Sequence, residues 1–143
     1  MNATIPDVLT FVVAQIQALG YPVYTGLAPQ GAKLPYVTLN VIATNPNYSL
    51  NGNAGIRIDE HTISLAIFDN HANAPSTLLS WDQGIGQLIE GIFNQTQNAT
   101  TIMSFDRGHT IGPVWEGHDN DWMLTSQWRI RSYADGSQPP EGS

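Results

Sequence analysis

Apolar residues near the start of the chain recur at helical spacing. They are Ile5, Val8, Leu9, Val12, Ile16 and Leu19, and this spacing places them on one face of an α-helix. Thr4 and Asp7 have the spacing of a capping pair, and Pro6 falls in the first turn, where a missing N–H costs nothing. Gly20 follows as a C-terminal stop. The pattern predicts an amphipathic helix over residues 5–19.

The next stretches favour β-strands. Val23–Thr25 is a short extended piece, and Tyr36–Ile42 is β-branched and nearly alternating, which is typical of a strand. Residues 45–55 hold four asparagines, two glycines and a proline without any period. We therefore expect a long hairpin connection there, leading into a second strand over residues 56–68.

The second strand contains a change of phase. Ile56 and Ile58 share one face, whereas Ile63, Leu65 and Ile67 fall on the other. One strand cannot turn both sets towards one core without a bulge near residues 59–61. Alternatively, the first part of the strand projects as an arm and buries Ile56 and Ile58 against a partner. The sequence leaves both alternatives open.

A second helical pattern opens at Asn73 and is expected to run to about Asn94. Its apolar stripe consists of Leu78, Trp81, Ile85, Leu88, Ile89 and Ile92. Gly84 and Gly91 lie along one edge of that stripe. Because a helical glycine costs ~1 kcal/mol relative to alanine, they suggest close approach to a sheet or to a neighbouring subunit. A polar connector is expected over residues 94–101.

The last third of the chain has β character. Thr101–Phe105 and Thr110–Glu116 are expected strands, and Gly112-Pro113 makes the latter an edge or bulged strand. Trp122–Tyr133 has the clearest alternation, because Trp122, Leu124, Trp128 and Ile130 share one face and Thr125, Gln127, Arg129 and Arg131 the other. The Gly/Pro/Ser-rich residues 134–143 are expected to form a flexible tail.

These elements predict the fold class α+β: a mainly antiparallel β-sheet with two helices packed on one face and a long β-hairpin arm. Residues 1–133 are expected to form a single domain, since 143 residues fit one hydrophobic core. The chain has no cysteine, which excludes disulfides and thiolate chemistry. Neither a signal peptide nor a membrane-spanning run is expected.

Charge is scarce, because Asp, Glu, Lys and Arg make up 12% of the chain against about 25% in ordinary domains. A surface rich in neutral polar groups resembles the centre of a protein interface, where charges are costly to desolvate. The formal net charge of −7, with five basic residues, argues against sequence-specific nucleic-acid binding. DNA could pass such a surface without adhering.

One segment has the composition of a cation site. His118, Asp119 and Asp121 bring an imidazole and two carboxylates together within four positions. The segment lacks the spacing of a helical zinc motif or a calcium loop, and Asp and Asn are ordinary turn residues. A turn is the favoured interpretation, so no metal, no cofactor and no catalytic residue is predicted. A small metal-dependent hydrolase that uses these three residues is kept as an alternative.

Two successive stretches carry a resemblance to a known family. Val23–Ala32 (VYTGLAPQGA) and Leu34–Leu39 (LPYVTL) resemble the opening of tail-terminator, or tail-completion, proteins of long-tailed bacteriophages. The closing Trp128–Arg131 strand (WRIR) and the element order agree, so the likeness spans about residues 5–133. The family has no catalytic residues, and the resemblance implies a structural protein and not an enzyme.

The resemblance implies a homo-oligomeric ring, commonly a hexamer, at the tail–neck junction of a virion assembled in the host cytoplasm. The ring would cap the major tail tube protein and join it to a head-completion (neck) protein, with genome DNA passing through its lumen. The residues expected at subunit or partner contacts are Tyr48, Leu50, Ile56, Arg57, Ile58 and Trp115. A small adaptor domain outside any virion is the remaining alternative.

Overall fold

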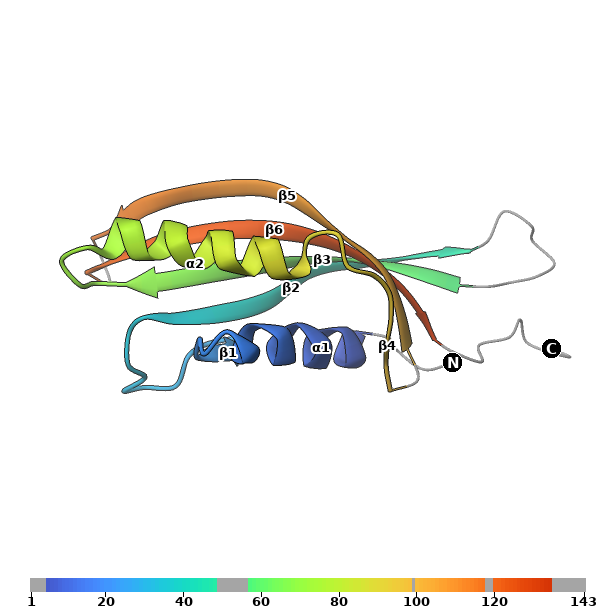
Figure 1. The fold of residues 1–143 in the computed structure, drawn as a ribbon. Coiled ribbons are helices and arrows are strands. Elements are labelled where there is room, and N and C mark those ends of the chain that lie inside the picture. The colour runs from blue at the N-terminus through green and yellow to red at the C-terminus, as the bar shows by residue number, and fades with distance from the viewer. Residues whose placement is uncertain (1–4, 49–56, 99, 118–119, 135–143) are drawn as a thin grey trace, which may run out of the picture.

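The computed structural model describes residues 5–48, 57–98, 100–117 and 120–134. Within them the element order is α1 (Ile5–Ala18), β1 (Val23–Thr25), β2 (Tyr36–Tyr48), β3 (Arg57–Asp69), α2 (Ala74–Ile89), β4 (Phe93–Gln97), β5 (Thr100–Glu116) and β6 (Asp121–Ala134) (Figure 1). The predicted α+β class is confirmed, with two helices that are each followed by strands.

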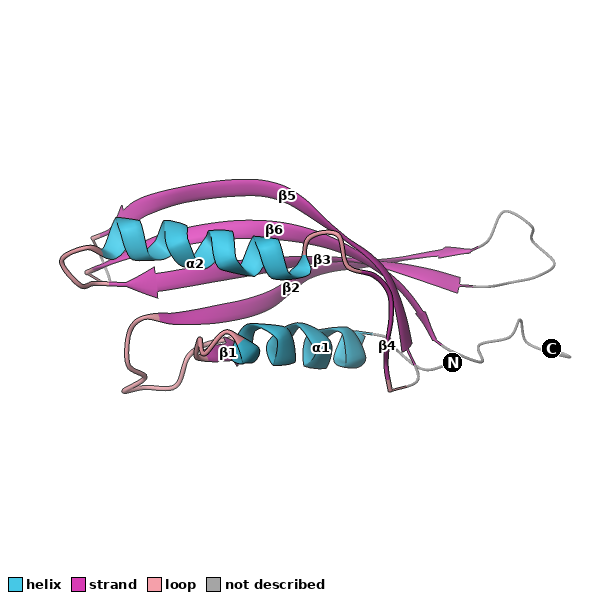
Figure 2. Cartoon of the chain, in the orientation of Figure 1, coloured by secondary structure: helices cyan, strands magenta, loops and turns pink. Residues whose placement is uncertain are grey.

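The strands form one six-stranded sheet in the order β1-β2-β3-β6-β5-β4. β1 runs parallel to β2, whereas the other neighbouring pairs are antiparallel, so the sheet is mixed. The sheet curves, and both helices lie on its concave side (Figure 2). The fully buried side chains between the two layers include Val12, Ile16, Leu39, Leu65, Leu78, Ile85, Trp128 and Ile130. Each large apolar side chain buried in this way contributes roughly 1.5–3 kcal/mol.

α1 begins and ends close to the predicted positions. Val8, Val12 and Ile16 face the core as expected. Leu19, which was predicted on the same face, is exposed, and Phe11, which was not, is buried. Gly20 adopts a φ of 86°, a conformation that favours glycine, and its N–H donates to the carbonyl of Gln17. The predicted cap Thr4 lies outside the described residues.

β2 is longer than predicted, because it continues through residues 45–48. These residues pair with β3 in register, from Asn45 opposite Glu60 to Tyr48 opposite Arg57. They carry no hydrophobic period because this end of the strand pair runs past the helices (Figure 1). The remainder of the predicted connection, residues 49–55, lies outside the described part of the chain.

The phase change predicted for β3 has a different origin from a bulge in that strand. β3 pairs with β6 without any register shift from Asp59 to Asp69, so the predicted bulge near residues 59–61 is wrong. The bulge lies across from it in β2, between Val41 and Ala43. Core-facing positions of β3 therefore continue from Ile63 to His61 and Asp59, which are buried polar residues. Ile58 consequently points to the opposite face of the sheet.

α2 ends earlier than predicted, and a strand replaces the expected connector. Gly91 follows the helix with a φ of 90°, a backbone conformation that favours glycine in a turn. The close approach that we predicted for it is therefore not its role. Gly84 does lie in a close contact: a Cβ there would meet the Tyr21 hydroxyl at 3.1 Å. Residues 93–97 then form β4. This segment has no apolar alternation and is a strand because it pairs with β5.

β5 is one long strand where the sequence predicts two. It is accommodated by three register shifts against β6, including one between Ile111 and Val114 that contains the predicted Gly112-Pro113 interruption. β4 pairs only with the first five residues of β5, so the rest is an edge of the described sheet. β6 shows the predicted alternation, with Leu124, Trp128 and Ile130 buried.

None of the helices in the described part of the chain is long and apolar enough to span a membrane. Residues 135–143, which make up nearly all of the predicted tail, lie outside that part.

Candidate functional site

A buried ion pair joins α2 to β5. Arg107 donates from Nη1 to Oδ2 of Asp82 at 2.9 Å and from Nη2 to Oδ1 at 2.8 Å. The guanidinium also lies 5.0 Å from the ring centroid of Trp128. Gly86 permits this approach, because a Cβ there would lie 3.1 Å from Nη2. Burial raises the pKa of the Asp82 carboxyl, and the positive charge of Arg107 opposes that rise.

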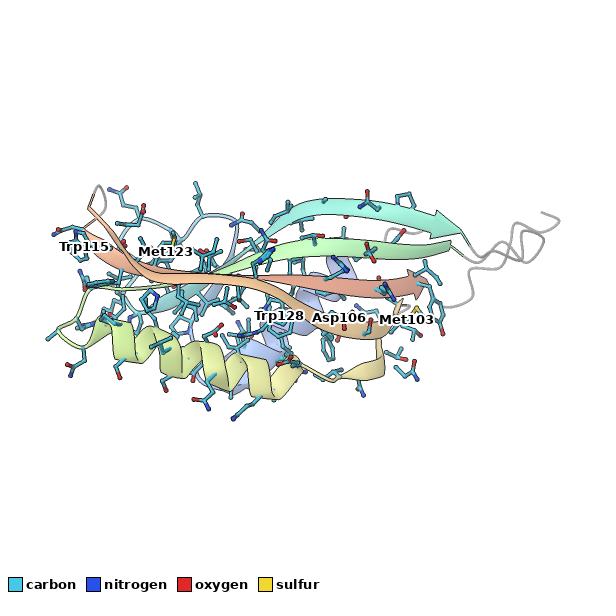
Figure 3. All side chains as sticks on the ribbon, turned by 90° about the horizontal axis from the view of Figure 1, so that it is seen from above. Met103, Asp106, Trp115, Met123 and Trp128 are labelled. Carbon is cyan, nitrogen blue, oxygen red and sulfur yellow. The ribbon has the colours of Figure 1, made fainter. Side chains whose placement is uncertain are left out.

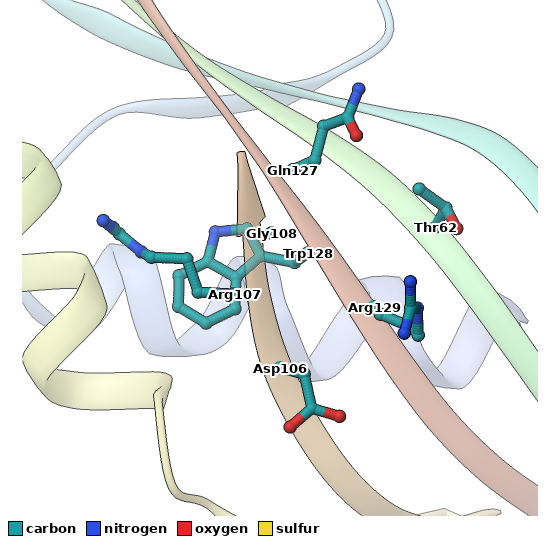
Figure 4. A pocket seen from close by; sticks show the side chains of 7 residues that line it. All are labelled: Thr62, Asp106, Arg107, Gly108, Gln127, Trp128 and Arg129. Atoms are coloured by element: carbon teal, nitrogen blue, oxygen red, sulfur yellow. The ribbon is translucent and has the colours of Figure 1, made fainter. Parts of the chain in front are cut away.

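This ion pair has a structural role. Figure 4 shows Arg107 beside the Trp128 indole and extending towards α2, while Asp106, Gln127 and Arg129 line a small hollow on the other side of the strands. A hollow of about 110 Å³ is small for a substrate. Both charges are neutralised by each other and hold the helix on the sheet, so neither is free to bind a ligand.

A chain of hydrogen bonds runs through the polar end of the core. The two ring nitrogens of the buried His61 lie 2.9 Å from the Thr44 hydroxyl and 3.2 Å from the Ser132 hydroxyl. The three side chains come from adjacent strands, so the imidazole ties β2, β3 and β6 together. A histidine with both nitrogens engaged in this way is typical of a satisfied structural residue.

A second imidazole, His71, contacts the carboxylate of Asp69 at the turn into α2. Oδ1 of Asp69 accepts from the His71 backbone N–H at 3.2 Å and also contacts its Nδ1. Asp69 is buried, whereas the His71 side chain is exposed. This pattern is ordinary Asx turn chemistry that fixes the start of the helix.

Only one residue of the possible cation site from the sequence lies in the described part of the chain. His118 and Asp119 lie outside the described residues, and Asp121 is buried at the start of β6. Among the described residues there is no group of three His, Cys, Asp or Glu side chains placed to hold a metal ion.

Four of the six predicted contact residues lie in the described part of the chain, at two ends of the sheet. Leu50 and Ile56 lie outside the described residues, and Tyr48 and Arg57 are described by backbone alone, paired on the last described rung of β2 and β3. Ile58, on the face away from the helices, is half-buried. Trp115 lies at the far end of β5 and packs edge-on against Trp122, with 47% of its surface exposed (Figure 3).

The structure also shows exposed apolar residues that the sequence analysis did not select. Leu27, Val41 and Ile42 lie along the β1–β2 side of the sheet, and Ile111 and Val114 lie on the β5 side. A sequence signal existed for some of them: Val41 and Ile42 are adjacent in one strand, so both cannot face one core. Their exposure depends on which strand edges are left open, and that information is not local.

The sheet face away from the helices is apolar at one end and charged at the other. Tyr36, Phe68, Met123 and Val114 are successive cross-strand neighbours on it. The first three line a hollow of about 630 Å³ that includes the loop at Leu27. At the other end Glu60 accepts from Arg131 at 3.2 Å and lies 4.0 Å from Arg129. The described surface thus offers apolar and neutral polar contact areas, the features of an assembly surface.

Comparison with known proteins identifies a similar fold. No protein family model and no curated protein matches the sequence. A solved structure described as the virion of a native gene transfer agent particle contains a chain that is similar in structure, with a TM-score of 0.57. The alignment covers 86% of this chain and 84% of that chain at 12% sequence identity.

Proposed function

We propose that this chain is a structural protein of a phage-type virion, specifically a tail-terminator or tail-completion subunit. The observation that carries the proposal is the similarity in fold to a chain of a gene transfer agent virion over most of both chains. The resemblance of Val23–Ala32 and Leu34–Leu39 to tail-completion proteins supports the same assignment. In this role a ring of copies, commonly six, caps the tail tube at its head-proximal end and joins it to a neck protein.

The physical character of the described surface supports a role in assembly. The ion pair and both imidazole contacts form within the chain and stabilise the fold. The net charge of −7 would let DNA move through a ring without adhering to it, because phosphates and carboxylates repel. These features suit a permanent component of a conduit.

Contacts with the tail tube and the neck are assigned to the two ends of the sheet. Tyr48, Arg57 and Ile58 lie at the β2–β3 end, Leu50 and Ile56 fall between β2 and β3 in the sequence, and the opposite end carries Trp115. Ile58 supports this placement because its strand register turns it away from the core. Trp115 supports it because an aromatic side chain half exposed at the end of a strand is a common interface anchor.

Deletion of the gene from the phage that encodes the chain tests this function. We expect filled heads that lack tails, together with free tails of uncontrolled length, both visible by negative-stain electron microscopy. Expression of the wild-type chain in trans should restore joined particles, and so should the variant Gln83→Ala, which alters an exposed side chain of α2 away from the proposed contacts. Joined particles of normal tail length in the deletion strain would overturn the proposal.

A further inference from the structure

The exposed apolar side chains of the sheet gather at two opposite edges. Among the described residues, one group consists of Leu27, Val41 and Ile42 beside β1 and β2, and the other of Ile111 and Val114 on β5. We call them the β2 edge and the β5 edge. Because β1 and β2 begin the strand order and β5 and β4 end it, the two groups lie on opposite sides of one sheet.

Both edges are left open by short neighbouring strands. β1 pairs with Val37–Leu39 only, and β4 pairs with Thr100–Ser104 only, within the described part of the chain. Beyond these points β2 and β5 each have one paired side, and most of their side chains are exposed. An open strand edge of this kind is a surface at which another chain can dock.

The edges are better suited to side-chain packing than to strand addition. Pro46 on β2 and Pro113 on β5 have no N–H to donate to a ladder, and both strands are bulged near the exposed residues. Bulges and prolines are the features by which sheet edges resist uncontrolled pairing. The apolar side chains remain available all the same, so the contact that they favour is a packed one.

Charge points to a second copy as the occupant of each edge. Identical copies with a net charge of −7 repel one another, so a contact between two copies is favoured at surfaces that add no further like-charge repulsion. Residues 40–46 on β2 and residues 110–114 on β5 contain no Asp, Glu, Lys or Arg. Each edge is thus both apolar and neutral, which suits the centre of an interface between copies.

We propose that copies of this chain associate head to tail, with the β2 edge of one packed against the β5 edge of the next. Such a contact uses two different surfaces of each copy, so it repeats around a ring when the rotation between neighbours closes. Closure into a ring rests on the proposed function, whereas the edge-to-edge contact itself does not. The two edges are thus the surfaces between subunits, and they are distinct from the two ends of the sheet that are assigned to the tube and the neck.

Disulfide trapping tests the contact directly, since the natural chain contains no cysteine. The variant Ile42→Cys/Ile111→Cys carries one thiol on each edge, and mild oxidation should produce a ladder of dimers, trimers and larger species on a denaturing gel. The matched control is Leu79→Cys/Ile111→Cys, in which Leu79 on α2 is 53% exposed and Ile42 is 52% exposed. We expect at least tenfold less cross-linked product from the control.

A second measurement avoids dependence on disulfide geometry. Ile42→Glu and Ile111→Glu should each weaken self-association of the otherwise unmodified chain by at least tenfold in sedimentation equilibrium, while Leu79→Glu leaves it unchanged. Circular dichroism would verify that each variant is folded. Equal cross-linking by the control pair, or glutamate variants that associate like the wild type, would overturn the inference.

The result separates this inference from the proposed function. If the chain is incorporated into particles but cross-links only through Leu79, the edge contact is wrong and the virion role stands. If the chain remains monomeric at the highest soluble concentration and no edge disulfide forms, the edge contact is wrong, and the gene deletion decides the virion role independently.

Discussion

Arg107 and Asp82, twenty-five positions apart in the sequence, form a bidentate ion pair with N–O distances of 2.9 and 2.8 Å. The pair attaches α2 to β5 above the Trp128 ring. Because the helices pack against one side of a curved sheet, this polar contact within an apolar layer helps to define where α2 lies.

Removal of one partner should be costly. Asp82→Leu leaves the Arg107 charge unpaired, and loss of one member of a buried pair costs about 3–5 kcal/mol. We expect the lower end of that range, because the Arg107 side chain is 23% exposed and retains some solvation. The free energy of unfolding in urea measures the loss. The double variant Asp82→Leu/Arg107→Met should regain most of the stability, since no charge remains buried; a double variant no more stable than the single one contradicts this account.

Gly112 should tolerate no side chain. Its φ is 113°, and a Cβ there would lie 2.7 Å from the carbonyl oxygen of Met123. Gly112→Ala should therefore lower the free energy of unfolding by about 2 kcal/mol or more. Gly117→Ala is the matched control, because its Cβ would have no neighbour nearer than 3.6 Å. Equal thermal stability of the two variants would show that the β5 bulge is not held as described.

The carboxylate of Asp7 should make stability depend on pH. It accepts from Asn98 at 3.0 Å and from Thr100 at 2.6 Å, and these hydrogen bonds lower its pKa from the ordinary value of 3.8. A lowered folded-state pKa contributes stability above the unfolded value, and that contribution is lost as the pH falls through the folded value. Wild type should thus be more stable than Asp7→Asn at pH 7, and the difference should shrink below about pH 4. A difference that is constant from pH 7 to pH 2 would contradict the assignment.

Ile58 should matter for assembly more than for folding. Its side chain points away from the core, so Ile58→Asp should change the free energy of unfolding by less than about 1 kcal/mol. The same variant should fail to restore joined particles in the deletion strain, because a charge would then lie at the proposed partner contact. Thr62→Asp, on the same face of β3, should restore them. Failure of both variants, or success of both, would remove Ile58 from the contact.

The regular elements could be predicted because their periods are local. α1 has apolar residues at helical spacing, and β6 has apolar residues at every second position. Both elements begin and end within a residue or two of the prediction. The sequence correctly separated Ile58 from the face that carries Ile63, Leu65 and Ile67. It could not show that β3 needs no bulge, because the burial of the polar His61 depends on hydroxyl partners in β2 and β6.

Other features depend on partners that are distant in the sequence. β4 (FNQTQ) has no apolar period and is a strand only because β5 pairs with it. Arg107 lies where a loop was predicted, and nothing near it indicates Asp82 as its partner. The apolar edges were missed for the same reason, since the exposure of Ile42 and Ile111 depends on the lengths of β1 and β4.

A reconstruction of the head–tail junction by electron cryomicroscopy, from the particles to which we propose that this chain belongs, tests the central claim most directly. The account predicts that the chain fits a ring between the tail tube and the neck, with Ile42 of one copy facing Ile111 of the next. Particles whose junction is complete without any density for this chain would contradict it.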